Sequence, residues 1–395
     1  MTIPIYPSDS RKAFGKSDRA WLCLTTLHHR RFIEDAIHVV GLPPGAHVRL
    51  RYRRQYIDDA LWLEVADNLP VERELALVTL AATNKAGENE VAPLRIGRIV
   101  AARCEGSLLT VDIALREFVY EVYPMGTFYD EIKGLARNLP NRFGSKTTGT
   151  FVQRLPVPPE SLVAGSGVAA WERAADTFFR IDTTTINTDK DVKHRAIPFL
   201  YYIAPRFSKM SSGITGRGEL HVEAGSTTRF DIHTIAAPVA GKIRNPLGEV
   251  HCDLAHPAAT FVSSRRVRID SRRDLRTVSV STTALFRRKY GHFSVRTVYF
   301  DYEDGESDDS DTSSGTDSIA SADGRTEVVA ARYDFPMAVG RLMPWIASLL
   351  VAAAGAVATY KAPKGSDLEV FKPIAVFILA LLGLVSGWRG QAKGE

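Results

Sequence analysis

Two long apolar runs near the end of the chain dominate its pattern of hydrophobic and polar positions. Residues 342–360 form nineteen consecutive positions without a charged side chain. As a helix they reach about 28 Å, close to the hydrocarbon thickness of a bilayer. A second apolar helix is expected over 367–388, because Ser366 and Glu369 have the spacing of a capping box. The pattern predicts a two-helix transmembrane hairpin within 336–395.

Small residues recur on both predicted spans. Gly383 and Gly387 form a G-x-x-x-G motif, and Ser348, Ala352 and Ala356 continue a small-residue seam on the first span. Small side chains let helix backbones approach closely in lipid. We expect the seam to pack the two helices together, or alternatively to join hairpins of several copies into a homo-oligomer. The apolar runs contain no ionisable residue, so a charge-lined ion pathway is not expected.

Shorter patterns in residues 1–154 predict a small α+β domain built on a curled sheet. Residues 47–53 alternate strictly, with Val48, Leu50 and Tyr52 on one face, as in a half-buried strand. The expected elements are a strand at 21–27, an amphipathic helix after it, strands at 47–53 and 75–82, a hairpin of 94–103 and 107–116, and a helix near 128–139.

The following region has the pattern of an all-β domain. Residues 155–167 are rich in Pro and Gly and predict a linker. After a short helix beginning near Val168, strand patterns alternate with Gly, Pro and Ser turns, which predicts a β-sandwich over 168–300 with an immunoglobulin-like layout. The candidate strands are 197–203, 219–224, 228–235, 249–254, 260–269, 275–283 and 293–300.

The net charge of +5 conceals a strong asymmetry along the chain. Residues 301–324 contain nine acidic residues and no basic one, so we expect a disordered acidic tether over 301–326. Residues 1–300 contain 42 basic and 31 acidic residues, a charge of +11. A basic body favours an anionic partner, whether a nucleotide, a nucleic acid or a lipid headgroup.

Basic residues are concentrated in two places, and these are the candidate anion-binding positions. The segment 265–296 is the denser of the two, and the strand pattern at 47–53 carries a second, weaker stripe. The alternative is that both are solvated strand faces. The candidates are Arg265, Arg266, Arg268, Arg272, Arg273, Arg276, Arg287, Arg288 and Lys289, with Arg296 in the same segment, and Arg49, Arg51 and Arg53.

A metal-dependent enzyme with a site built from His233, His251 and His256 is a further alternative. Histidine and aspartate alternate around these positions, but their spacing matches no common ligand motif. The sequence also lacks the phosphate-binding, nucleophile and zinc-protease signatures of the common enzyme families. We therefore predict no catalytic residue, no metal site and no cofactor.

The expected location is the inner (cytoplasmic) membrane, as a multi-pass protein with residues 1–335 in the cytoplasm. The first thirty residues contain no apolar run typical of a secretory signal. Cys23, Cys104 and Cys252 are too few and too scattered for a disulfide framework, which suits a reducing compartment. A hairpin of two spans returns the chain to the side from which it entered.

These expectations favour a non-enzymatic sensor or effector, whose β-rich domains bind an anionic ligand or partner and control the two-helix membrane module. In layout alone the plan resembles bacterial membrane effectors of phage defence, which implies membrane disruption on sensing. The other non-enzymatic reading is a static membrane tether or scaffold for a protein or nucleic acid. The acidic segment is further expected to fold back over residues 265–296 and to compete there with an anionic ligand.

Overall fold

The computed structural model covers the whole chain, and the residues it describes end at Gly340. The predicted spans 342–360 and 367–388, with all their packing residues, lie outside the described residues. Within the described ranges no helix is long and apolar enough to cross a membrane. The described residues are 11–14, 19–27, 30–67, 74–83, 89–121, 127–135, 149–155, 159–184, 197–238, 246–270, 272–283, 287–302, 318–320 and 325–340.

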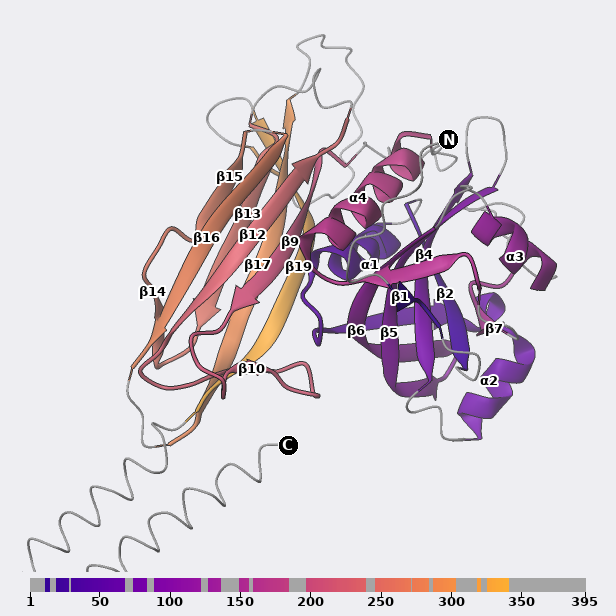
Figure 1. The fold of residues 1–395 in the computed structure, drawn as a ribbon, viewed down its shortest axis with the longest axis horizontal. Coiled ribbons are helices and arrows are strands. Elements are labelled where there is room, and N and C mark those ends of the chain that lie inside the picture. The colour runs from indigo at the N-terminus through magenta and orange to yellow at the C-terminus, as the bar shows by residue number, and fades with distance from the viewer. Residues whose placement is uncertain are drawn as a thin grey trace, which may run out of the picture.

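The described chain is mainly β, with three sheets of antiparallel or mixed strands and few helices (Figure 1). The coarse fold prediction is therefore confirmed. One sheet comes from the first half of the chain, and two further sheets, of seven and four strands, come from the second half. The buried residues form a hydrophobic core that draws members from all three sheets.

The first sheet has eight strands in the order β1-β8-β6-β5-β4-β2-β7, with β3 added on β6. Only the β2–β4 pair is parallel. Every residue of β2 and β4 is buried, whereas β3 buries alternate residues as predicted. The strands are β1 Arg11–Lys12, β2 Ala20–Thr26, β3 His47–Arg53, β4 Leu75–Thr83, β5 Asn89–Glu105, β6 Leu108–Glu121, β7 Val152–Leu155 and β8 Leu162–Gly165.

The described α-helices all contact strands of the first sheet. Three of them were predicted, whereas α2 was not. The side chain of Asp58 caps α2 by accepting a hydrogen bond from the backbone N–H of Leu61, at 3.1 Å. The helices are α1 Arg30–Gly41, α2 Asp59–Ala66, α3 Thr127–Leu135 and α4 Gly167–Thr184, with a 3₁₀ turn at Arg54–Tyr56.

The second half of the chain forms two sheets that pack on each other. Phe230 of β12 stacks on Phe293 of β17 with ring centroids 4.5 Å apart, and Phe335 of β19 adds to the same cluster. The four-stranded sheet contains β9 Phe199–Arg206, β12 Thr227–Ala236, β14 Ala259–Phe261 and β16 Arg273–Thr282. The seven-stranded sheet contains β10 Gly213–Ile214, β11 Leu220–Val222, β13 Gly248–Ala255, β15 Arg266–Ile269, β17 Lys289–Tyr302, β18 Ser318–Ala320 and β19 Arg325–Val339.

All seven candidate strands of this region coincide with strands of the structure, and the segment 260–269 divides into β14 and β15. The segment 155–167, expected to be a linker, contributes the buried strand β8, which pairs with β6. Part of the predicted linker thus belongs to the first sheet.

Strand β19 is the largest departure from expectation. It was not predicted, and it occupies the end of the expected tether and the start of the expected membrane region. It pairs antiparallel with β17 over its whole length and parallel with β11 near its end. Pro336 and a register shift next to Val298 interrupt the alternation that would have identified it.

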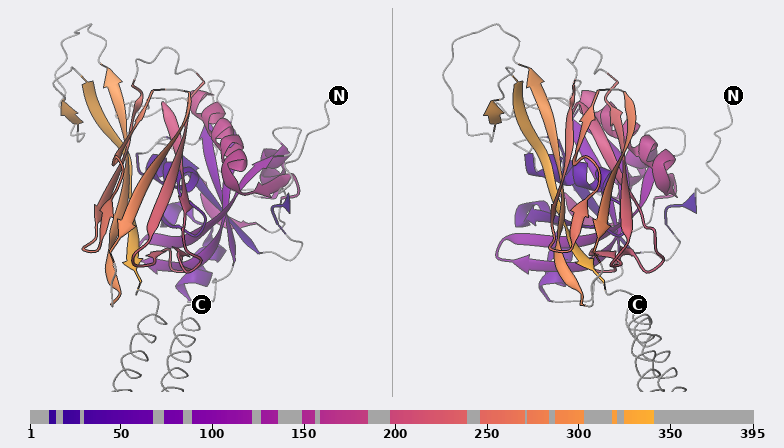
Figure 2. Two further views of the ribbon diagram at one scale, coloured as in Figure 1. Left: turned by 60° about the vertical axis from the view of Figure 1, so that its left-hand side comes forward. Right: turned by 90° about the vertical axis from the view of Figure 1, so that its left-hand side faces the viewer.

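The acidic segment therefore connects β17 to β19 and does not lead directly into the predicted spans. Fifteen residues of paired strand lie between the two. Most of the acidic segment, and any contact it makes with residues 265–296, lies outside the described residues. Figure 2 shows β19, in yellow, running along the sheet to the end at which the described chain stops.

The first sheet and the later sheets are in direct contact. The Tyr333 hydroxyl of β19 donates a hydrogen bond to the carbonyl of His47 in β3. Trp171 of α4 stacks on Tyr202 of β9 with centroids 5.8 Å apart, and Phe118 of β6 meets the same tyrosine edge-on at 5.4 Å. These contacts attach the first sheet to both sheets of the second half.

Candidate functional site

The end of the seven-stranded sheet where β19 finishes is the best candidate for a functional surface. Lys289, the first residue of β17, lies opposite Val339, the last residue of β19. The backbone N–H of Gly340 then donates to the carbonyl of Val222 at 2.7 Å. On the four-stranded sheet, Thr283 follows β16 at this same end. We call it the exit end.

Basic residues surround the exit end. Arg287, Arg288 and Lys289 stand exposed where the chain enters β17. Lys209 lies in the turn before β10, and this turn is placed at the exit end by Glu223, whose backbone N–H donates to Ser212 Oγ at 3.0 Å. We call Lys209, Met210, Arg287, Arg288, Lys289 and Tyr290 the exit rim.

The exit rim combines free positive charge with exposed apolar surface. Its four basic side chains make no ion pair within the described parts of the chain. The Met210 side chain is fully exposed, and Tyr290 is 65% exposed. A cationic surface with a few exposed large apolar side chains is suited to an anionic bilayer, where aromatic residues lie at the headgroup level.

The remaining arginines of segment 265–296 are not gathered at the exit end. Arg272 and Arg273 lie at the opposite end of the sheets, since Arg273 pairs in register with Ile235 near the end of β12. Arg265 and Arg276 belong to different sheets: the backbone of Arg265 bonds to Cys252 of β13, whereas Arg276 is in β16. The sequence cluster is thus divided between two sheets and two ends.

Several of these arginines already have carboxylate partners. Arg268 is 2.9 Å from Asp270, Arg276 is 3.0 Å from Asp274, and Arg273 is 3.5 Å from Glu172. Arg265 lies over the ring of Phe261 at 5.5 Å. Arg272 is exposed, and Arg266 and Arg296 lie on the outer face of the seven-stranded sheet.

The arginine stripe of β3 is a solvent-facing strand face, as its alternation predicted. Arg49 lies directly opposite Asp112 of β6 and is paired with it at 2.7 Å. Arg51 and Arg53 are exposed and make no ion pair within the described chain. The charge of the stripe is therefore partly neutralised. The stripe lies on the first sheet, whereas the exit rim lies at the end of the seven-stranded sheet.

The three histidines of the enzyme alternative do not form a common site. His233 lies on β12, beside the stacked pair of Trp171 and Tyr202. His251 lies on β13 and contacts Glu249, at 2.5 Å, and Arg296, at 2.9 Å. His256 accepts from the backbone N–H of Ala258. Across the described residues no three potential ligands come close enough to hold a metal ion.

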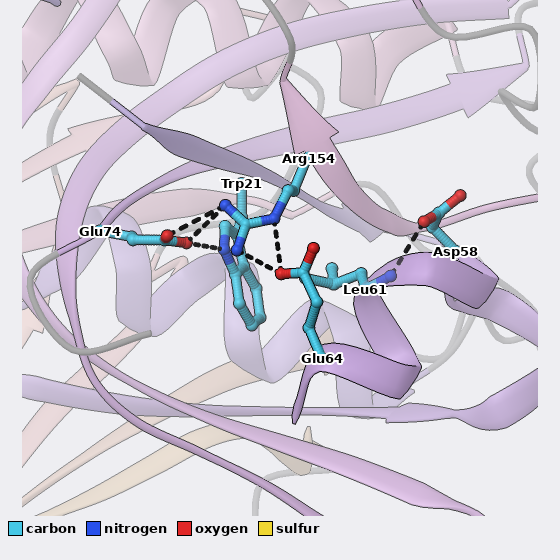
Figure 3. A network of polar contacts seen from close by, with 6 residues as sticks. All are labelled: Trp21, Asp58, Leu61, Glu64, Glu74 and Arg154. Carbon is cyan, nitrogen blue, oxygen red and sulfur yellow. Dashed lines mark hydrogen bonds and ion pairs between the residues drawn. The ribbon is translucent and has the colours of Figure 1, made fainter. Parts of the chain in front are cut away.

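A polar network that the sequence did not reveal lies at the edge of the first sheet (Figure 3). The Trp21 indole donates to Glu74 at 2.5 Å, and Arg154 donates to Glu74 at 3.0 Å and to Glu64 at 2.9 Å. These groups belong to β2, the residue before β4, β7 and α2, so the network ties four elements together. Its charges are satisfied internally, which indicates a structural role.

Two titratable groups on α1 are enclosed with few partners. Burial lowers the pKa of His38 to about 4, although the His38 ring bonds to the backbone of Arg332 in β19. Burial raises the pKa of Asp35 to about 7, against the opposing effect of Arg31. Burial also raises the pKa of the Cys23 thiol to about 12, so this cysteine is not a nucleophile.

Comparisons with known proteins give no family assignment. No protein family matches the sequence, and no curated protein is significantly similar to it.

Proposed function

We propose that this protein is a non-enzymatic sensor or effector anchored in the inner membrane, with residues 1–335 in the cytoplasm. In this proposal the spans 342–360 and 367–388 form a transmembrane hairpin, and the β-rich body lies against the anionic leaflet. The observation that carries the proposal is the position of the exit rim at the point where β19 ends, three positions before the first predicted span begins.

The exit rim supports docking on anionic lipid. Each lysine or arginine close to an anionic membrane contributes about 1 kcal/mol, so four of them contribute about 4 kcal/mol at physiological salt. Met210 and Tyr290 add apolar surface at the same place. This contribution is modest next to that of two spans, and its effect is to orient the body on the membrane.

Strand β19 supports a coupling between the body and the hairpin. It is paired on both sides near its end, and the Gly340 backbone is itself bonded to Val222. A change in the body would therefore reach the first span without passing through a long flexible connection. This is the reason to prefer a sensor or effector over a static tether.

The finer architecture belongs to the same proposal. The first sheet and its helices would be a small α+β domain, and the two later sheets a β-sandwich with an immunoglobulin-like layout. Gly383 and Gly387, with Ser348, Ala352 and Ala356, would pack the hairpin or join hairpins of several copies into a homo-oligomer.

The test is made with the full-length protein in bacterial membranes and in nanodiscs. Alkaline carbonate should leave the protein in the membrane pellet, and extraction by carbonate would contradict the anchoring. For the docking, a fluorophore on Met210→Cys in nanodiscs with brominated anionic lipid should be quenched. The matched control is Leu275→Cys, which is half exposed on β16. Equal quenching at both sites would contradict docking through the exit rim.

Growth of the producing cells separates the sensor or effector from the static tether. If the hairpin acts on the membrane, the full-length protein should arrest growth and depolarise cells, and Gly383→Leu with Gly387→Leu should relieve this. Membrane insertion without depolarisation under every condition would favour the tether.

A further inference from the structure

The outer face of the seven-stranded sheet carries a row of three arginines and one histidine that runs across four strands. Arg266 of β15 lies in register with His251 of β13, His251 with Arg296 of β17, and Arg296 with Arg332 of β19. Residues directly opposite each other on paired strands project from the same face. We call Arg266, His251, Arg296 and Arg332 the arginine row.

Polar contacts confirm that these side chains share one face. Arg296 Nη2 lies 2.9 Å from His251 Nδ1, and His251 Nε2 lies 2.5 Å from Glu249. Since Nδ1 accepts from a guanidinium, the ring proton is on Nε2 and is donated to Glu249. The histidine thus fixes the position of the Arg296 guanidinium from the neighbouring strand, and its own side chain is only 5% exposed.

The cations of the row are incompletely neutralised by the protein. Arg266 makes no ion pair within the described residues, and Arg332 reaches Asp334 only at 3.4 Å. The buried Nε–H of Arg296 has no hydrogen-bond partner in the described part of the structure. Like charges directly opposite each other on neighbouring strands are destabilising, and Arg296 and Arg332 are in that relation.

Glu249, Asp253 and Asp334 flank the row, but within the described residues none of them forms an ion pair with Arg266 or Arg296. Glu249 is engaged by His251, and Asp334 accepts a hydrogen bond from the Ser294 hydroxyl. The Arg332 side chain remains 65% exposed. A tetrahedral anion placed over Arg296 and Arg332 would accept from both guanidinium groups, which bind phosphate with paired, charge-assisted hydrogen bonds.

We propose that the arginine row is a binding site for a soluble molecule carrying two phosphate groups. One phosphate would bridge Arg296 and Arg332, and the other would bind Arg266. At a strand spacing of about 4.8 Å, the backbone of Arg266 lies about 10 Å from that of Arg296 and about 14 Å from that of Arg332. The binding site stands on its own, whereas its use as the sensing site rests on the proposed function, because Arg332 lies on the strand that leads to the predicted spans.

The position of the row favours a soluble ligand over a lipid headgroup. Val339 comes seven positions after Arg332, which is about 23 Å along the strand. A leaflet in contact with the exit rim is therefore remote from the row. The row and the exit rim are two separate cationic surfaces with different expected partners.

The test uses the full-length protein in neutral detergent, with inorganic pyrophosphate, inorganic phosphate and vesicles rich in phosphatidylserine as probes. Pyrophosphate should bind saturably in calorimetry and raise the melting temperature, with phosphate at least tenfold weaker. The affinity should fall as salt rises. Absence of saturable pyrophosphate binding would overturn the proposal.

Variants identify the site. Arg332→Gln and Arg266→Gln should each weaken pyrophosphate binding at least tenfold. The matched control is Arg268→Gln, on the same face but paired with Asp270, and it should change the affinity less than twofold. Without ligand, Arg332→Gln should melt at the same temperature or higher, because it removes the repulsion from Arg296. Unchanged binding by both row variants would contradict the site.

The result separates this proposal from that of the membrane anchor. Pyrophosphate binding by a protein that carbonate extracts from membranes would preserve the site and reject the anchoring. Anchored protein without pyrophosphate binding would do the reverse. Loss of binding to phosphatidylserine vesicles in Arg332→Gln would instead assign the row to lipid and contradict the soluble ligand.

Discussion

The polar network around Glu74 and the arginine row both contain arginine and acidic side chains, but they differ in how these charges are paired. In the network, one guanidinium lies between two carboxylates, and a tryptophan indole completes the hydrogen bonds of Glu74 (Figure 3). In the row, three guanidinium groups lie on three strands with His251 on a fourth, and among the arginines only Arg332 has an ion-pair partner within the described residues, at 3.4 Å. In the first arrangement every charged group is paired, whereas the second leaves Arg266 and Arg296 without a carboxylate partner among the described residues.

The difference separates a charge that holds the fold from a charge that is available to a ligand. Removing one member of a closed buried network leaves the others unpaired and desolvated, which is costly. Removing one member of an open like-charged group relieves repulsion and costs little stability. Stability measurements on matched substitutions therefore distinguish the two roles without knowledge of the ligand.

The largest expected effect is in the closed network. Glu74→Gln leaves Arg154 with one carboxylate partner, and because Glu74 is 9% exposed the loss should be about 3 kcal/mol. For a protein of 395 residues this corresponds to a fall of about 4 °C in melting temperature. Differential scanning calorimetry of the full-length protein in detergent measures it.

Glu64→Gln is the matched control, since Glu64 binds the same guanidinium but is 31% exposed. It should lower the melting temperature by less than half as much. Equal effects of the two substitutions would show that enclosure of the network does not determine its strength.

The second effect concerns Asp35 and His38, which are enclosed but lack closed networks. The pKa of His38, lowered to about 4, makes the folded state lose stability as pH falls from about 6.5 toward 4. The pKa of Asp35, raised to about 7, makes it gain stability as pH falls from about 7 toward 3.8. The two contributions oppose each other between pH 7.5 and 5.5.

Asp35→Asn removes the opposing contribution of Asp35 and leaves the pH dependence of stability that comes from His38. Relative to the wild type, the variant should lose about 2 kcal/mol between pH 7.5 and pH 5.5, a relative shift of about 2 to 3 °C in melting temperature for a protein of this size. Melting curves of both proteins at the two pH values give this difference directly. Parallel pH profiles would mean that Asp35 is ionised like a surface carboxylate.

The smallest effect is expected on β3. Arg49→Gln removes an exposed ion pair with Asp112, and such pairs contribute about 0.2 to 1 kcal/mol. The melting temperature should fall by no more than about 2 °C, and the difference should vanish in 1 M salt. A larger, salt-independent fall would place this stripe with the closed network.

Local patterns were predictable, and arrangements between distant segments were not. The face of β3 followed from alternation within 47–53, and α1 from the spacing of its apolar residues. The arginine row depends on residues 251, 266, 296 and 332, which only strand pairing brings into one register. The sequence cluster at 265–296 suggested one patch, but the strands carry its members to different sheets.

Strand β19 shows the physical limit of pattern reading most clearly. Pro336 removes a backbone donor, the register shift next to Val298 breaks the period, and the strand follows a segment too acidic to suggest a sheet. Its stability comes from β17 and β11, which pair with it on both sides. Likewise, nothing in the local sequence shows that Glu74 meets Trp21 and Arg154.

The position of β19 between β11 and β17 also constrains how the protein is made. The sheet is incomplete until the last described strand has been synthesised, and residues 303–339 take about 2 to 7 s at the usual rate of translation. During that time β17 has one unpaired edge, which is a template for aggregation. Nine acidic residues in 301–324 follow that edge in the sequence, and charges that flank an exposed strand act against its association with other chains. The strand that completes the sheet ends at Val339, so it is synthesised before the apolar run at 342–360.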